Sequence, residues 1–317
     1  MCSLFGVLDY SHTLSNSVLT RIVSALSHEC EVRGTDATGI AYINRGELKV
    51  YKRPLPARRI KFKLPKNCRA VMGHTRLTTQ GSEKFNYNNH PFSGNAGGVN
   101  FALAHNGVLR NDNGLRISEE LPQTNIETDS YVAVQLIEKK NALDFDSLKH
   151  MAEKVEGSFT FTVLDQLGKL YFVKGDSPMC IYKFHTLGFY IYASTEEILN
   201  KAVTRLGLKE YEHNRVELFC GDMFSIDAQG NESKAGFEYS EAIPWRCYGS
   251  YWGNYKNSGL TSFVHDYWEE LRSMAHYFGY LPDDIDCFRR MGYPPDAVED
   301  MLYDGEIPTR EYFAECM

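Results

Sequence analysis

The chain has 317 residues and a formal net charge of −7, and it is 43% hydrophobic and 24% charged. This length suits one large domain or two modest ones, and the composition is typical of a globular protein. The acidic balance argues against a broad surface for nucleic acids or anionic membranes. No apolar run reaches the roughly 18 residues of a membrane span, and no signal segment opens the chain. The eight cysteines are scattered without a CxxC pair, so we expect a cytoplasmic protein without a metal site or a disulfide framework.

The first element is an apolar run at residues 4–8, which predicts a buried strand with Cys2 at its tip. Removal of Met1 would expose a thiol and an α-amine on the same residue. Their reference pKa values, about 8.5 and about 7.7–8.0, make the amine a built-in base for the thiol. A cysteine at this position is by itself more often an accident than a nucleophile, so the catalytic interpretation depends on the rest of the chain.

A helix is expected next, capped by Ser15 or Asn16, with apolar side chains at i, i+3 and i+4 spacing. These side chains are Val18, Leu19, Ile22, Val23 and Leu26. Residues 33–39, which begin with Arg33 and contain two glycines, predict a turn before a strand at residues 40–43. The freedom of glycine to adopt positive φ is enough to explain this segment as an ordinary loop.

Polar groups follow the next predicted strand, at residues 70–76. Arg76 suits a ligand carboxylate, because its planar fork donates two parallel hydrogen bonds. A surface arginine in a salt bridge is the competing interpretation. His90 lies in the polar loop at residues 88–92, and a histidine there is more often a hydrogen-bonded loop residue than a ligand.

Residues 101–105 predict another apolar strand, which Asn106-Gly107 is expected to end. An Asn-Gly pair after a strand is usually a hairpin turn. Alternatively, the Asn amide and an adjacent backbone N–H form an oxyanion hole. Residues 127–130 are expected to begin a helix. The Asp129 carboxylate there is either stabilised by the helix N-terminus or faces a ligand ammonium.

The chain continues with a helix near residues 145–155, strands at 159–164, 170–173, 180–184 and 189–193, a helix after Thr195, and a strand at 222–226. Hairpins in place of βαβ units indicate antiparallel or mixed sheets covered by helices. Residues 229–262 are rich in Gly, Ser, Tyr and Asn, which predicts a linker or extended arm. Residues 263–317 predict a small helical module of short helices, one of which begins at Pro282.

Six features in this order resemble the class II glutamine amidotransferase domain of the N-terminal nucleophile hydrolases. The matching residues are Cys2, residues 33–39, Gly73-His74-Thr75-Arg76, Asn88-Asn89-His90-Pro91, His105-Asn106-Gly107 and Glu127-Thr128-Asp129. The glutaminase domains of glucosamine-6-phosphate synthase and amidophosphoribosyltransferase are the most similar. The resemblance covers roughly residues 2–228 and does not extend to residues 229–317.

The resemblance implies an α+β fold, a four-layer αββα sandwich, here with a small C-terminal helical extension. It also implies a glutaminase that releases ammonia from L-glutamine without a cofactor. The implied roles are the nucleophile for Cys2, with its own amine as base, the oxyanion hole for Asn106 and Gly107, and support of the N-terminal residue for Arg33. The implied substrate contacts are Arg76 and Thr79 for the α-carboxylate and Asp129 for the α-ammonium, and we place His90 in the same glutamine site.

Two residues depart from the pattern of the synthase relatives, because Leu77 stands in place of a channel-gating Trp and Gln80 in place of a His. Residues 229–317 are also too few for the acceptor domains of those relatives. We therefore expect a stand-alone glutaminase, a separate ammonia-acceptor protein, or a homo-oligomer formed through the C-terminal helices. Two alternatives stay open: hydrolysis of another γ-glutamyl amide, and a non-catalytic binding or regulatory protein with this fold.

Overall fold

The computed structural model describes residues 2–239 and, beyond them, residues 268, 271, 272, 275, 280–293, 298, 301 and 302. The chain divides into two compact units, Met1–Gly249 and Ser250–Met317. Each unit is described by itself.

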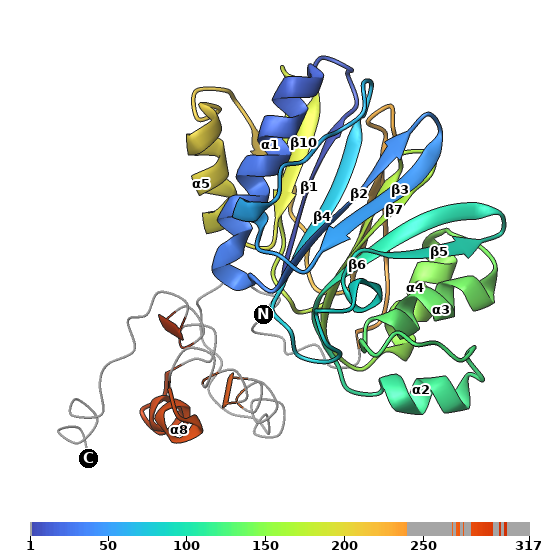
Figure 1. The fold of residues 1–317 in the computed structure, drawn as a ribbon, viewed down its shortest axis with the longest axis vertical. Helices are drawn as coiled ribbons and strands as arrows, with labels where there is room; N and C mark the ends of the chain where they lie inside the picture. The colour runs from blue at the N-terminus through green and yellow to red at the C-terminus, as the bar shows by residue number, and fades with distance from the viewer. Residues whose placement is uncertain are drawn as a thin grey trace. The chain divides into compact units, whose positions relative to one another are not determined.

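The first unit is a four-layer sandwich of two sheets between two helix layers (Figure 1). Over residues 2–239, one sheet has seven strands in the order β11-β9-β10-β1-β4-β2-β3, and the other has six in the order β13-β12-β8-β7-β6-β5. Neighbouring strands are antiparallel in both sheets. The αββα fold expected from the sequence is confirmed.

The strands of the seven-stranded sheet are β1 Ser3–Asp9, β2 Ala37–Asn44, β3 Glu47–Arg53, β4 Ala70–Arg76, β9 Cys180–Phe184, β10 Phe189–Ala193 and β11 Asn214–Arg215. Those of the six-stranded sheet are β5 Phe92–Ala96, β6 Val99–Leu109, β7 Gly157–Asp165, β8 Leu170–Lys174, β12 Asp222–Ile226 and β13 Glu232–Gly236. The helices of this unit are α1 Asn16–Glu29, α2 Asp112–Ser118, α3 Tyr131–Lys140, α4 Phe145–Lys154 and α5 Glu196–Leu206, with short 3₁₀ turns η1 Cys30–Arg33, η2 Ala57–Arg59 and η3 Asn86–Asn88.

Three apolar layers hold the sandwich together. One lies between the seven-stranded sheet and the pair α1 and α5, and a second lies between the six-stranded sheet and the pair α3 and α4. The third lies between the two sheets and contains Leu4, Met72 and Ala104. Because side chains alternate along a strand, residues at even spacing from these three also face the space between the sheets.

Helices α1 and α5 begin where the sequence predicts. The Ser15 hydroxyl accepts a hydrogen bond from the Val18 amide at 3.3 Å, which caps α1. The Thr195 side chain caps α5 in the same way, and Gly207 ends that helix in the left-handed region at φ +71°. These caps satisfy backbone groups that have no partner inside the helix.

Two local expectations were wrong. The strand expected at residues 40–43 already begins at Ala37 in β2, where it pairs with Arg76. Asn106 and Gly107 do not end a strand, because β6 continues to Leu109. The Gly107 backbone has φ +134°, and a Cβ there would lie 2.0 Å from the Ser158 carbonyl oxygen. Glycine therefore lets the ladder pass through a conformation that side chains rarely adopt.

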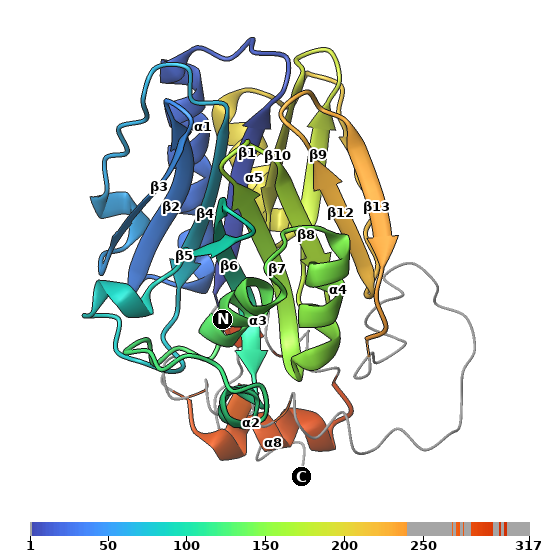
Figure 2. The ribbon, with the colours of Figure 1, turned by 90° about the vertical axis from the view of Figure 1, so that its right-hand side faces the viewer.

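The six-stranded sheet extends beyond residue 228, because β13 pairs with β12 (Figure 2). Residues 240–262 of the segment expected to be a linker lie outside the described residues. In the second unit, α8 spans Pro282–Arg290. The buried apolar residues that are described in this unit form one cluster: Trp268, Leu271, Ala275, Ile285, Phe288, Val298 and Leu302. The spacing of apolar residues at 263–280 predicts an amphipathic helix, but Phe263, Met274 and Phe278 of its apolar face lie outside the described residues. No described helix has both the length and the apolar character that crossing a membrane requires.

Candidate active site

Cys2 lies at the start of the central strand of the seven-stranded sheet. Strand β1 is paired with β10 on one side and β4 on the other, so Ser3 lies opposite Thr75 at the end of β4. Cys2 is 9% exposed, and its thiol donates to the Leu77 carbonyl oxygen at 3.4 Å. The predicted nucleophile is therefore held by a strand that is paired on both edges.

Arg33 contacts the backbone of Cys2 directly. Its Nε donates to the Cys2 carbonyl oxygen at 3.1 Å, and the residue is 5% exposed. Arg33 ends the turn η1, and Gly34 follows in extended backbone conformation. A Cβ on Gly34 would lie 2.5 Å from the Arg76 carbonyl carbon. Glycine at this position therefore allows the turn to press against the end of β4.

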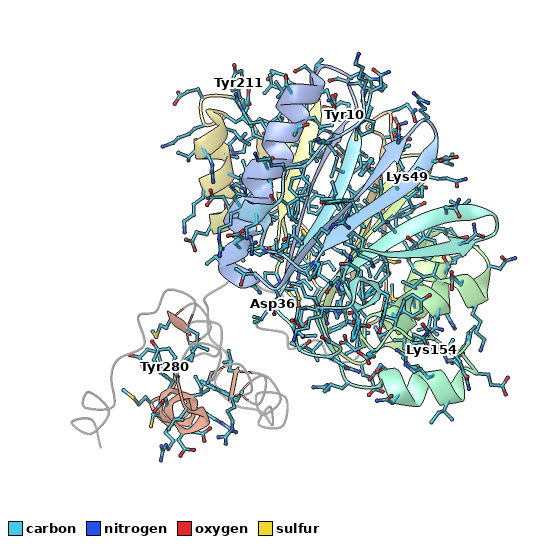
Figure 3. The ribbon with its side chains drawn as sticks, viewed as in Figure 1. Tyr10, Asp36, Lys49, Lys154, Tyr211 and Tyr280 are labelled. Carbon is cyan, nitrogen blue, oxygen red and sulfur yellow. The ribbon has the colours of Figure 1, made fainter. Side chains whose placement is uncertain are left out.

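Asp36 completes the attachment of this turn to β4. Its amide donates to the Arg76 carbonyl oxygen at 2.9 Å, and its carboxylate accepts from the Thr78 amide at 2.7 Å. Figure 3, viewed as Figure 1, shows Asp36 at the edge of the sheets. The segment 33–39, which as a pattern resembled an ordinary loop, thus supports both Cys2 and the loop after β4.

Arg76 is buried at the end of β4, with an exposed fraction of 2%. Its guanidinium donates to Asn89 Oδ1 at 2.6 Å, to the Gln80 carbonyl oxygen at 2.5 Å and to the Gly81 carbonyl oxygen at 2.8 Å. These bonds use three of the five N–H donors of the side chain. Arg76 is thus held by a side chain and by the loop that follows its own strand.

Asn106 lies opposite Thr160 in the pairing of β6 with β7, and strand alternation places it between the sheets, like Ala104. It is fully buried, and within the described part of the chain neither Oδ1 nor Nδ2 has a hydrogen-bond partner. A buried polar group without a partner costs about 1–3 kcal/mol. Such an amide suits a position where a ligand supplies the partner.

A hydrogen bond between the two sheets brings Asn106 close to the end of β4. His74 Nε2 lies 3.0 Å from the His105 carbonyl oxygen. His74 is two residues before Arg76, and His105 directly precedes Asn106. The bond therefore holds the end of β4 against the segment of β6 that carries the Asn-Gly pair.

Asp129 is fixed at the end of β6 and does not cap α3. One of its carboxylate oxygens accepts from the Leu109 amide at 2.6 Å, and the other accepts from the Ser130 hydroxyl at 3.2 Å. The Ser130 hydroxyl also lies 2.8 Å from His105 Nδ1. This network places the carboxylate by contacts with a neighbouring strand that the local sequence does not reveal.

Burial and nearby charges together shift the pKa of the Cys2 thiol. Burial raises the pKa of the Cys2 thiol, the Arg76 charge lowers it, and the Asp129 charge raises it. Burial also lowers the pKa of Arg76, against the charges of Cys2 and Asp129. A buried thiol with a raised pKa is protonated at neutral pH, so a reaction at Cys2 needs a base close by.

Three buried histidines lie beside these groups. The rings of His74 and His90 have centroids 4.2 Å apart, and those of His90 and Phe92 are 4.4 Å apart. Burial lowers the pKa of His74 to about 3, and it also lowers the pKa values of His90 and His105. These imidazoles are neutral at physiological pH. Across the described residues, no group of histidine, cysteine or carboxylate side chains has the arrangement of a metal site.

The remaining two residues expected in the glutamine site are placed differently. His90 is 3% exposed, and within the described residues its ring nitrogens have no hydrogen-bond partner. Thr79 lies on the exposed part of the loop after β4. The structure thus places Arg33, Arg76 and Asp129 near Cys2. Asn106 lies on the segment of β6 that His74 contacts through the His105 carbonyl oxygen.

Three residues near Arg76 have no role that the sequence predicts. Asn88 and Asn89 belong only to a motif, and Lys52 on β3 belongs to none. Of the three, Asn89 bonds to Arg76 directly. Lys52 Nζ donates to the carbonyl oxygens of Asn89 and Pro91 at 2.5 and 3.1 Å. Burial, reinforced by the Arg76 charge, lowers the pKa of Lys52 to about 8. The local sequence gives no sign of a role for Lys52, because the residues that it contacts lie about forty positions later in the chain.

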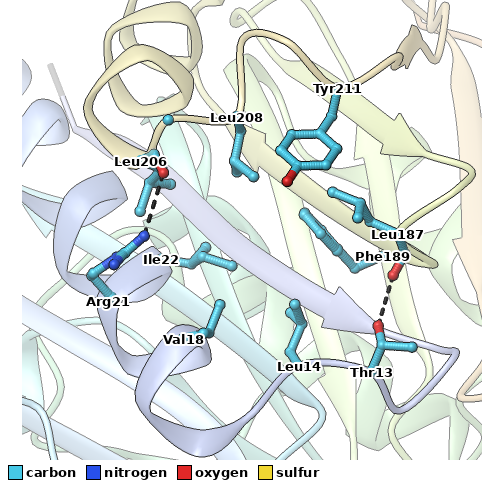
Figure 4. Close-up of a pocket in the computed structure, with 11 residues that line it drawn as sticks. Thr13, Leu14, Val18, Arg21, Ile22, Leu187, Phe189, Leu206, Leu208 and Tyr211 are labelled. Carbon is cyan, nitrogen blue, oxygen red and sulfur yellow. Dashed lines mark hydrogen bonds between the residues drawn. The ribbon is translucent and has the colours of Figure 1, made fainter.

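A pocket of about 280 Å³ lies elsewhere in the first unit (Figure 4). Its lining includes Ile22 of α1, Leu206 of α5 and Phe189 of β10. Phe189 pairs with Asp9, at the opposite end of β1 from Cys2. None of the predicted site residues lines this pocket.

Comparisons with known proteins identify curated relatives of this chain. No family model matches the chain. It is 29% identical over 242 residues to the glutamine–fructose-6-phosphate aminotransferase (isomerizing) of Staphylococcus epidermidis, a match that covers 73% of this chain and 38% of that protein. It is 31% identical over 194 residues to the enzyme of the same name from Sulfurisphaera tokodaii, covering 57% of this chain and 31% of that protein. The chain thus spans less than half the length of these curated relatives.

Solved structures support the same fold. Glutamine phosphoribosylpyrophosphate amidotransferase from Bacillus subtilis superimposes with a TM-score of 0.57 at 20% identity, over 75% of this chain and 49% of that one. A structure described as the allosteric regulatory enzyme of purine biosynthesis gives a TM-score of 0.58 at 20% identity, with the same coverage. The first unit shares its αββα fold with these two structures, and the chain resembles the class II glutamine amidotransferases.

Proposed function

We propose that this chain, whose first unit resembles the class II glutamine amidotransferases, hydrolyses the side-chain amide of L-glutamine to glutamate and ammonia. The observation that carries the proposal is a buried thiol close to two opposite charges, together with a buried amide that has no hydrogen-bond partner among the described residues. Cys2, Asn106, Arg76 and Asp129 supply these groups. A zwitterionic amino acid needs one cationic and one anionic contact, and the carbonyl of its amide needs hydrogen-bond donors.

In the proposed mechanism, removal of Met1 makes the α-amine of Cys2 available as the base. The amine takes the thiol proton, and the thiolate sulfur forms a bond to the amide carbon of glutamine. The oxyanion accepts hydrogen bonds from Asn106 Nδ2 and the Gly107 N–H. Since burial raises the thiol pKa, a base on the same residue meets the requirement of the site.

The amine then returns its proton to the amide nitrogen, the carbon–nitrogen bond breaks, and ammonia leaves. The product is a γ-glutamyl thioester on Cys2. Water attacks this thioester, the carbon–sulfur bond breaks, and glutamate is released with a free thiol. Atoms and charge balance with glutamine and water as the only reactants, so the mechanism needs no cofactor.

The substrate contacts follow from the charges of the site. The donors of Arg76 that are not used by Asn89, Gln80 and Gly81 bind the α-carboxylate. Asp129 accepts from the α-ammonium. Thr79 and His90 stay proposals as glutamine-site residues: the first is exposed at the loop, and the second is packed against His74.

The fate of the ammonia is a second part of the proposal. The curated relatives are named as aminotransferases that use fructose 6-phosphate, and the matched region spans 38% of the first of them. We infer that ammonia formed here is either released or passed to a separate acceptor protein. Residues 263–317, which the sequence predicts to form a small helical module, are the proposed contact for an acceptor or for a second copy of the chain.

The experiment measures ammonia and glutamate formed from L-glutamine by the protein, together with its intact mass. The protein without Met1 is expected to be active. Cys2→Ala is expected to abolish ammonia release, and Cys30→Ala to retain it. Cys30 is a suitable control because it is also buried, with a pKa raised to about 12 by burial. Equal activity of both variants, or full activity with Met1 retained, contradicts the proposed mechanism. Release of amines from γ-glutamyl amides in preference to glutamine would favour the alternative hydrolase.

A further inference from the structure

Arg76 ends β4, and Asp129 lies in the loop before α3. One buried side chain connects the loop after Arg76 to the residues before Asp129. Arg76 is held by the carbonyl oxygens of Gln80 and Gly81. Asp129 follows Glu127 by two residues. Asn88 is fully buried and contacts both segments, and the mechanism above gives it no role.

Both the nitrogen and the oxygen of the Asn88 side-chain amide form hydrogen bonds in this connection between the two segments. Its Nδ2 donates to the Ser82 carbonyl oxygen at 3.1 Å and to Glu127 Oε2 at 2.7 Å. Its Oδ1 accepts from the Glu127 amide at 2.9 Å. The Asn88 carbonyl oxygen accepts from the Thr128 hydroxyl at 2.8 Å. One residue thus bonds to the segment after Arg76 and to the two residues before Asp129.

Two further contacts connect the same segments. The Gln80 side-chain amide donates to the Glu127 carbonyl oxygen at 3.0 Å. The Ser82 amide donates to Glu127 Oε2 at 3.4 Å. Gly81 has φ +74°, and a Cβ there would lie 3.0 Å from the Glu127 Cβ, so the two backbones approach closely. The separation of the loops is therefore fixed by hydrogen bonds and by contact.

The residue after Asn88, Asn89, contacts the Arg76 guanidinium directly. Asn89 Oδ1 accepts from Arg76, and Asn89 Nδ2 donates to the Glu83 carbonyl oxygen at 2.7 Å. Asn89 thus orients the guanidinium, while Asn88 places the loop of Arg76 relative to the loop of Asp129. Bonds of this kind reduce the freedom that a substrate would otherwise have to overcome on binding.

We propose that Asn88 is a positioning residue that fixes the separation between Arg76 and Asp129, and so selects substrates with a carboxylate and an ammonium on one carbon. This inference rests on the proposed glutaminase function. Asn88 does not touch the substrate. It acts through the two charged groups, so its loss affects ligands that contact both groups more than ligands that contact one.

The test compares Asn88→Ala with Asn95→Ala in the Met1-free protein. Asn95 is an exposed asparagine on β5 whose amide bonds to Asn100. The substrate is L-glutamine. The competitors are 4-carbamoylbutanoate, which lacks the α-ammonium, and 4-aminobutanamide, which lacks the α-carboxylate. Far-ultraviolet circular dichroism and the unfolding midpoint establish that each variant is folded.

Asn88→Ala is expected to raise KM for L-glutamine about tenfold, the effect of about 1.4 kcal/mol in binding, with kcat within about threefold. The inhibition constants of the two competitors are expected to change less than about twofold. Asn95→Ala is expected to match the wild type. An unchanged KM, or competitors that weaken as much as glutamine, overturns the positioning role.

A second variant keeps the test decisive if Asn88→Ala does not fold. Glu127→Ala removes, at an exposed position, the carboxylate that accepts from Asn88 Nδ2, and the same change in KM with the same competitor pattern is expected. The proposed function fails separately: a wild-type protein that releases no ammonia from L-glutamine overturns it and the positioning role together. An active wild type with unaltered Asn88→Ala and Glu127→Ala variants overturns the positioning role alone.

Discussion

Arg33 donates its Nε hydrogen to the carbonyl oxygen of Cys2, the residue proposed as the nucleophile, at 3.1 Å. The contact fixes the backbone of Cys2 and does not involve the groups proposed to bind glutamine. Arg33→Ala is therefore expected to lower kcat about tenfold or more, with KM for glutamine within about threefold, since small misplacements of reacting groups cost rate. Arg33→Lys is expected to restore part of the loss. Steady-state kinetics check both variants, and a rise in KM at constant kcat would contradict this role.

Arg76→Ala is expected to raise KM for L-glutamine about tenfold or more, because a charge-assisted pair with the α-carboxylate is worth about 1.5–3 kcal/mol. Its guanidinium also holds the carbonyl oxygens of Gln80 and Gly81. Arg76→Lys keeps the charge but not the fork, and an intermediate KM is expected. The measurement is ammonia release as a function of glutamine concentration. A KM equal to that of the wild type would refute the assignment.

Gly34→Ala is expected to lower the free energy of unfolding by about 1–3 kcal/mol, the usual cost of forcing extra atoms into a packed region. The added Cβ would lie 2.5 Å from the Arg76 carbonyl carbon and 2.6 Å from the Leu77 nitrogen. Gly114→Ala is the matched control, because a Cβ on that helical glycine meets no atom within 4 Å. This control is expected to be neutral or stabilising by up to about 1 kcal/mol. Equilibrium unfolding in urea gives the free energy of unfolding of both variants. Equal values would show that the turn accommodates the extra methyl group without loss of stability.

The three buried histidines predict a loss of stability in acid. Their native pKa values are lowered by burial, to about 3 for His74, so between that value and about pH 6.5 the unfolded chain binds protons that the native state does not. The stability that comes from neutral imidazoles is thus fully present above about pH 6.5 and falls as the pH drops. Each histidine contributes up to about 1.4 kcal/mol per pH unit.

Unfolding free energies at pH 7.5, 6.5 and 5.5 check this expectation. His90→Phe keeps a ring between His74 and Phe92 but removes one proton site. Its free energy of unfolding is expected to depend less steeply on pH than that of the wild type. Carboxylates also titrate in this range, but they are common to both proteins. Identical slopes would mean that His90 does not titrate on unfolding.

The sequence predicts those parts of the fold that have a clear local signal. The apolar spacing of α1, its Ser15 cap and the buried run of β1 are such signals, and the structure confirms them. The sequence does not predict strand β3, because none of its seven residues is buried and four of them are charged. Helix α2 is short and presents Ile117 to solvent, so it lacks the apolar face that periodicity detects.

The supporting contacts of the site could not be read from the chain. Asn106-Gly107 has the composition of a hairpin turn, but the pairing of β6 with β7 extends through it. Likewise, Asn88 and Lys52 act through contacts with residues 37 to 40 positions away. Such contacts form only when the loops come together in the folded protein. The motif therefore identifies the residues but does not show which residues they contact.

The position of β1 in the sheet determines how rigidly the nucleophile is held. This strand has hydrogen-bonded neighbours on both edges, and its seven residues are buried. Its amide hydrogens are therefore expected to exchange with solvent only through opening of a large part of the sheet, at rates near those of global unfolding. Adjustments that admit a substrate are then left to the segments around it, at residues 77–82 and 127–129. Cys2 serves as the fixed reference point to which these segments align.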